Sequence, residues 1–124
     1  MIEGYWANRQ DAKKRPTRYY SSRQEKRVAK VIGGRQVSNS GAPPFVAGDV
    51  TSDYFLIECK TKTQEVKSVS IYKHWLEKNQ EEAFAMNKPY SALAFDFGDG
   101  ENYFVIDERT FKHFNKLLKE AENG

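Results

Sequence analysis

An apolar stretch at residues 54–57 continues into residues 58–61, where charged and uncharged side chains alternate, and the pattern predicts a β-strand. Successive side chains of a strand point to opposite faces. One face carries Tyr54, Leu56, Glu58 and Lys60, and the other carries Phe55, Ile57, Cys59 and Thr61. A carboxylate therefore stands beside an ammonium group at the end of an otherwise apolar strand. Such charges are rarely buried without a partner or a function.

Apolar residues spaced three and four apart predict three helices. We expect these helices at residues 22–32, 73–87 and 108–122. In the first helix, Ser22 stands at the N-cap and Glu25 three positions later, which is the pattern of a capping box. Gly33 or Gly34 ends that helix in the left-handed conformation. The third helix is expected to begin at the side-chain cap of Asp107.

Turn residues delimit further strands on either side of the second helix. We expect these strands at residues 35–38, 49–52, 90–97 and 102–107, with an additional short strand at 69–72. Gly98-Asp99-Gly100 joins the last two strands as a hairpin, and Asp96 and Asp99 are interpreted as hairpin residues. The order α-β-β-β-α-β-β-α predicts an α/β fold with a mixed five-stranded sheet flanked by helices.

The length of 124 residues is typical of one domain, which we expect over residues 21–124 after a basic arm over residues 1–20. The single cysteine excludes an internal disulfide and fits a reducing compartment. No apolar run approaches the ~20 residues that a membrane helix needs. The first residues also lack the apolar region of a secretory signal. These features predict a cytoplasmic protein.

Basic residues are concentrated in the first third of the chain. Residues 1–35 hold ten Lys/Arg and three Asp/Glu, whereas residues 36–124 hold ten and fourteen. This asymmetry indicates contact with a polyanion, and a solvated tail is the alternative. The residues best placed to follow a phosphate backbone are Lys13, Lys14, Arg15 and Arg18. Tyr19 or Tyr20 is suited to stacking on exposed bases, although either ring could instead dock the arm on the domain.

Asp49 can lie beside Glu58 if residues 49–52 pair antiparallel with the strand at 54–61. Two carboxylates within ~4 Å repel by about 4 kcal/mol at an effective dielectric constant of ~20. A shared proton, Lys60 or a divalent cation would relieve that repulsion, and oxygen ligands of this kind suit Mg²⁺. Lys60 could then hold a water or neutralise charge on a phosphoryl group. The alternative is a salt bridge at a strand end.

Four segments between residues 21 and 61 together resemble motifs of the PD-(D/E)xK nuclease superfamily, and more narrowly of archaeal-type Holliday junction resolvases and their phage relatives. Residues 21–26 resemble the Gly-Ser-Arg-x-Glu-Arg helix start, and residues 38–41 resemble the Ser-Gly-rich loop. Residues 48–50 stand where the family has Pro-Asp-Ile or Pro-Asp-Val, and residues 57–61 resemble its glutamate–lysine strand. The resemblance covers about residues 21–106.

This resemblance implies a restriction-endonuclease-like fold and a homodimeric, Mg²⁺-dependent endonuclease that resolves four-way DNA junctions, with Mn²⁺ as a substitute ion. The implied catalytic residues are Glu25, Asp49, Glu58 and Lys60. The implied metal ligands are Asp49, Glu58 and the Cys59 backbone carbonyl, with Glu25 as a further candidate. The expected DNA contacts are Lys13, Lys14, Arg15, Arg18, Arg23, Ser40 and Lys62. The expected setting is the cytoplasm, that of the host if the protein is phage-encoded.

The sequence departs from the family pattern at three places. Gly48 replaces the proline before the aspartate, and the basic N-terminal arm is longer than the family pattern predicts. Residues 96–101 are expected to form an acidic hairpin where archaeal members tend to be basic. Two alternatives stay open. One is a duplex- or flap-cutting nuclease of the same superfamily, and the other is a non-catalytic nucleic-acid-binding module. Glu25 also has two interpretations, as the capping-box residue or as an active-site acid.

Overall fold

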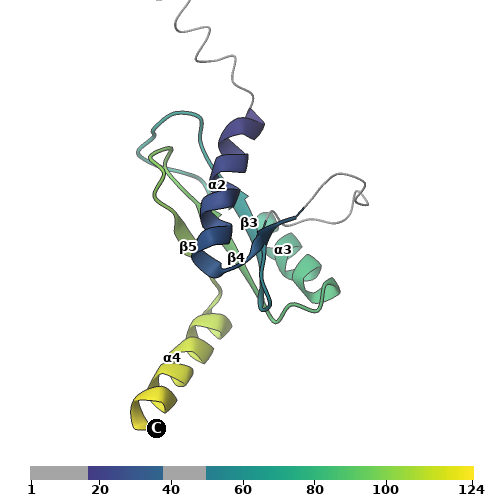
Figure 1. The fold of residues 1–124 in the computed structure, drawn as a ribbon, viewed down its shortest axis with the longest axis vertical. Coiled ribbons are helices and arrows are strands. Elements are labelled where there is room, and N and C mark those ends of the chain that lie inside the picture. Colours follow the sequence, from purple (N-terminus) through teal and green to yellow (C-terminus); the bar gives the residue numbers. More distant parts are fainter. Residues whose placement is uncertain (1–16, 38–49) are drawn as a thin grey trace, which may run out of the picture.

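The computed structural model describes residues 17–37 and 50–124, which form a five-stranded mixed sheet with helices (Figure 1). The strands lie in the order β1-β2-β3-β4-β5. Their bounds are Arg35–Gln36, Val50–Thr51, Phe55–Lys60, Tyr90–Phe95 and Tyr103–Val105. The helices of the described residues are α2 (Thr17–Ile32), α3 (Lys73–Ala85) and α4 (Glu108–Asn123). The expected element order and the mixed five-stranded α/β sheet are confirmed.

Strands β1, β2 and β3 follow one another as antiparallel neighbours. The β2–β3 pair sets Val50 opposite Ile57, so the antiparallel pairing expected for these two segments is confirmed. After β3 the chain crosses through α3 and returns as β4, parallel to β3, with Glu58 beside Leu93. Strand β5 is the last strand of the sheet and pairs antiparallel with β4. The carboxyl ends of β3 and β4 therefore meet at one edge of the sheet.

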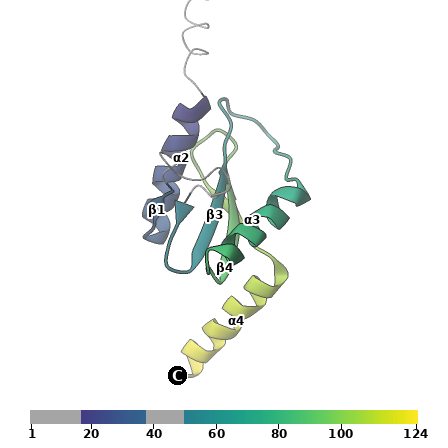
Figure 2. The same cartoon turned by 90° about the vertical axis from the view of Figure 1, so that its right-hand side faces the viewer.

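Helices α2 and α3 cover opposite faces of the sheet (Figure 2). The face under α2 holds a buried apolar cluster in which Val28 of the helix meets Val50, Ile57 and Cys59. On the other face Leu56 and Leu93 are buried, and the Asn79 side chain of α3 donates to the carbonyls of Leu56 and Ala92. Glu58 and Lys60 alternate with Ile57 and Cys59, which places them on the α3 face.

Helix α2 begins at Thr17, five residues before the expected N-cap, so the capping box at Ser22 is wrong. Proline is tolerated at the start of a helix, and Pro16 precedes this one in the sequence. The early turns gain an i,i+4 contact in which Arg23 donates to the Tyr19 hydroxyl at 3.1 Å. Glu25 thus lies inside the helix. The expected end is confirmed, because α2 stops at Ile32 and Gly33 has a φ of +64°.

The short strand expected at residues 69–72 is absent from the described chain, since this segment has no regular structure. Both sides of β3 are occupied by β2 and β4, so the segment could pair only at the outer edge of β1 or β5, and in the described chain it pairs with neither. The segment instead crosses over the α3 face, where Val69 is half-buried and Ile71 is exposed.

Gly98 allows the turn after β4 to touch the connection that follows β3. Its φ is +85°, and a Cβ atom at this position would overlap the backbone carbonyl of Gln64. The N–H of Val66 donates to the carbonyl of Phe97 at 2.8 Å. These contacts fix the segments that follow β3 and β4 against each other at the carboxyl edge of the sheet.

Asp107 is the N-cap of α4, as expected, and its carboxylate accepts from the Thr110 N–H at 2.8 Å. Hydrogen bonds from the side chain and then the backbone of Thr110 lower the pKa of Asp107 below its ordinary value. Phe114 packs its ring against Phe55 and Tyr90, and the rest of the helix extends away from the sheet (Figures 1 and 2). No helix of the described residues is long and apolar enough to span a bilayer.

Candidate active site

Glu58 and Lys60 are direct neighbours near the carboxyl end of β3, as the strand alternation predicts. The Lys60 Nζ lies 3.2 Å from the Glu58 Oε1. Both groups remain reachable from solvent, since the side chain of Lys60 is 37% exposed and that of Glu58 is 20% exposed. An ammonium group has three donors, so the bond to Glu58 leaves Lys60 able to donate to a second acceptor.

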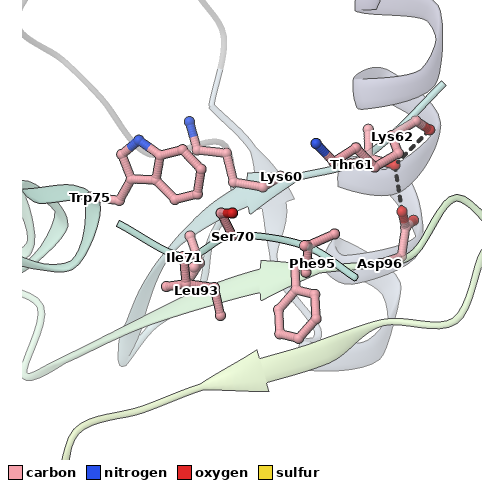
Figure 3. A pocket seen from close by; sticks show the side chains of 10 residues that line it. Lys60, Thr61, Lys62, Ser70, Ile71, Trp75, Leu93, Phe95 and Asp96 are labelled. Carbon is pink, nitrogen blue, oxygen red and sulfur yellow. Dashed lines mark hydrogen bonds between the residues drawn. The ribbon is translucent and has the colours of Figure 1, made fainter. Parts of the chain in front are cut away.

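Trp75, at the start of α3, holds Lys60 from the other side. The Lys60 Nζ lies 4.4 Å from the centroid of the Trp75 ring, which is a cation–π contact (Figure 3). A cleft of about 90 Å³ opens beside this pair, bounded by residues 60–62, the crossing segment at 69–71 and Leu93. This cleft has room for several waters next to a fixed cation.

Gln24 of α2 supports the strand end from the opposite face, and the sequence analysis missed it. This side chain is fully buried, and its Nε2 donates to the Lys60 carbonyl at 2.8 Å and to the Asn102 Oδ1 at 3.2 Å. Gln24 has the same helical phase as Val28 and Ile32, at intervals of four. That phase was the available signal, because a polar residue in line with core positions must find buried partners.

Asp96, interpreted from sequence as a hairpin residue, organises the carboxyl edge of the sheet. Its side chain is 1% exposed and binds the Arg27 Nη2 at 3.0 Å. It also accepts from the Thr61 hydroxyl at 2.6 Å, seen in Figure 3, and from the Gly98 N–H at 3.1 Å. Asp96 therefore ties together α2, the residue after β3 and the turn after β4.

Glu25 and Cys59 are placed separately from the Glu58–Lys60 pair. Glu25 accepts a hydrogen bond from the Gln36 Nε2 at 3.3 Å, so its carboxylate lies by the edge strand β1. Cys59 is buried in the apolar cluster under α2, as its position on the opposite face of β3 predicts.

The expected DNA contacts divide into those that the structure describes and those that it does not. Arg23 and Lys62 line one pocket at the carboxyl edge of the sheet. Arg18 falls within the range of α2. The expected site residues outside the described chain are Lys13, Lys14, Arg15, Ser40 and Asp49.

Within residues 17–37 and 50–124, no three His, Cys, Asp or Glu side chains are grouped as metal ligands. The described part of the site is thus one carboxylate, one ammonium group and a small cleft, arranged so that a phosphate or water can reach the ammonium. Comparisons of the chain with protein-family models, with curated proteins and with solved structures find no match to any of them.

Proposed function

We propose that this protein is a Mg²⁺-dependent, structure-selective DNA endonuclease that resolves four-way junctions by phosphodiester hydrolysis on a restriction-endonuclease-like fold. The observation that carries the proposal is the pairing of Glu58 with Lys60 at 3.2 Å, on a strand whose antiparallel neighbour is β2. A carboxylate and an ammonium group two residues apart on a central strand are the chemistry that the glutamate–lysine motif requires.

The pairing of β2 with β3 supports a role for Asp49. Asp49 directly precedes Val50, and Val50 pairs with Ile57, the residue before Glu58. Asp49 itself lies outside the described residues, and its service as the second acid beside Glu58 is part of the proposal.

Carboxylate and carbonyl oxygens are the ligands that Mg²⁺ prefers, and they fit the donors on this strand. Asp49, Glu58 and the Cys59 carbonyl would hold the ion, whereas Glu25 is left out of the ligand set because it lies by β1, apart from Glu58. When bound, the ion supplies a Lewis acid that polarises the phosphoryl group and lowers the pKa of a water. Lys60 would donate to the attacked phosphate or orient the water, and Trp75 and Glu58 keep its Nζ in position.

Branched DNA as the substrate is supported by the family resemblance and by the surplus of basic residues before residue 36. The deciding experiment incubates the protein with a labelled four-way junction, a flap and a linear duplex of equal length, each in Mg²⁺ and in EDTA. We expect paired nicks in the junction when Mg²⁺ is present and none in EDTA. Equal cleavage of the linear duplex would overturn junction selectivity, and binding without any cleavage would favour the non-catalytic binding module.

A homodimer would present two active sites to a substrate with two-fold symmetry. The apolar face of α4 is the surface that we propose for this contact, because Phe111 and Leu118 are 67% and 69% exposed and lie seven residues apart. Residues at that spacing share one side of a helix. A second copy of α4 would bury them in an interface between identical surfaces.

Leu118→Glu is expected to halve the solution mass from twice the chain mass of 14.3 kDa to a single chain, because a charge at an apolar interface loses its hydration. Light scattering after gel filtration measures this. Lys116→Gln, which makes the same change in net charge on the opposite side of α4, should leave the mass unchanged. A wild-type protein of single-chain mass would contradict the dimer.

A further inference from the structure

A second pocket, of about 270 Å³, lies at the carboxyl ends of the parallel strands β3 and β4. We call it the cationic pocket. Its functional lining is the ring of Tyr20, the side chains of Arg23, Arg27 and Lys62, and the turn glycines Gly98 and Gly100. In open α/β sheets, ligands bind outside the carboxyl ends of parallel strands.

The two carboxylates in this pocket are already engaged. Asp96 is buried and binds Arg27, Thr61 and the Gly98 N–H. Asp99 accepts from the N–H of Glu101 at 3.1 Å. Asp96 is thus paired with Arg27, whereas Asp99 keeps its negative charge, so the pocket holds three cations against two carboxylates and is net positive by one charge.

Arg23 and Lys62 supply the positive charge of the pocket that is not paired with Asp96. Arg23 is exposed and binds a neutral group, the Tyr19 hydroxyl. Lys62 is exposed, and in the part of the chain that the structure describes neither cation has a carboxylate partner. Two such cations from different segments converge on one concave site, which favours an anionic ligand.

Helix α2 sets an aromatic ring in line with these cations. Tyr20, Arg23 and Arg27 are spaced by three and four residues, so they share one side of the helix. Gly98 and Gly100 put no side chain over the opposite rim. A ring beside cations is the combination that holds a nucleotide, with the phosphate on the cations and the base or sugar against the ring.

The cationic pocket continues from the cleft beside Lys60, because Thr61 and Lys62 line both. Two residues of extended protein chain span about 6–7 Å. A DNA strand with one phosphate at Lys60 can therefore place a neighbouring nucleotide at Lys62. A volume of about 270 Å³ lies near the lower end of the ~300–1,000 Å³ typical of small-ligand pockets, so the pocket can take one nucleotide-sized group but not a duplex.

We infer that the cationic pocket binds one unstacked nucleotide of the DNA strand whose neighbouring phosphate lies at Glu58 and Lys60. This inference rests on the proposed function for the identity of the strand. It deepens that function by giving a physical basis for structure selectivity, since base stacking is interrupted at a branch point and is continuous in an intact duplex.

The test is binding of a fluorescent four-way junction and of a linear duplex in EDTA, so that no hydrolysis intervenes. The variant is Arg23→Gln/Lys62→Gln, and the control is Lys26→Gln/Lys67→Gln, which removes two exposed lysines from α2 and the same connection outside this pocket. We expect the variant to bind the junction at least tenfold more weakly than the control does. Its salt slope should fall by about 0.7–0.9 for each phosphate that the variant no longer neutralises.

Tyr20→Leu should weaken junction binding about tenfold and leave duplex binding within twofold, because the ring meets only an unstacked nucleotide. The proposed role of the pocket would be overturned if the double variant and its control bound the junction with equal affinity and salt slope. It would also be overturned if Tyr20→Leu lost as much affinity for the duplex as for the junction. If the wild type does not cleave DNA but the double variant still binds the junction more weakly than its control, the result supports the pocket and rejects the proposed hydrolysis.

Discussion

Lys60→Met is expected to lower the rate of junction cleavage about a hundred- to a thousandfold while leaving junction affinity within a few fold. The substitution removes the ammonium group that lies 3.2 Å from Glu58 and keeps an unbranched apolar stem against Trp75. Loss of one preorganised donor to a transition state typically has an effect of this size. Single-turnover cleavage in Mg²⁺ measures the rate, and anisotropy in EDTA measures the affinity.

Lys67→Met is the matched control, because Lys67 is an exposed lysine of the connection that follows β3. It should cleave at the wild-type rate. Cleavage by Lys60→Met at the rate of this control would show that the ammonium group takes no part in the reaction. A parallel loss of affinity and rate would instead assign Lys60 to substrate binding.

Asp96→Asn should lower the free energy of unfolding by about 2–4 kcal/mol, the largest stability effect we expect from a polar substitution. The neutral amide of asparagine cannot form an ion pair with Arg27. Its nitrogen is also a donor, whereas both oxygens of Asp96 accept hydrogen bonds, from Thr61, Gly98 and Arg27. Chemical denaturation followed by circular dichroism measures the change.

Asp99→Asn in the same turn is the comparison for this effect. Asp99 is exposed and accepts one local bond from Glu101, so the substitution should cost no more than about 0.5 kcal/mol. Equal stabilities of the two variants would contradict the role assigned to Asp96, which is to join α2 to the carboxyl edge of the sheet.

Patterns among residues close in sequence predicted most of the fold. The alternation along β3, the glycine turn after β4 and the Asp107 cap each depend on neighbours in sequence, and each is found where the pattern predicts it. One error is local, since α2 begins at Thr17 and not at Ser22. The other arose where contacts distant in sequence decide the outcome. The segment at 69–72 has strand-forming residues, but the sheet offers it no partner beside β3.

The candidate site divides in the same way. The neighbouring positions of Glu58 and Lys60 follow from the period of two along a strand. The contacts that Gln24, Trp75 and Asp96 make with Lys60 and Thr61 could not be predicted from this period. Each contact joins residues that lie 15 to 36 positions apart in the sequence. Their partners are set by how α2, α3 and the β4–β5 turn pack around the end of β3.

The most direct test of the proposed active site is single-turnover cleavage of a four-way junction by the wild type and by Glu58→Gln, purified in parallel, in Mg²⁺ and in EDTA. The expected result is cleavage by the wild type in Mg²⁺, none in EDTA, and a loss of at least about a hundredfold in Glu58→Gln. Parallel purification separates this activity from a contaminating nuclease. No cleavage by the wild type, or equal cleavage by Glu58→Gln, would contradict a metal-dependent hydrolytic centre at the end of β3.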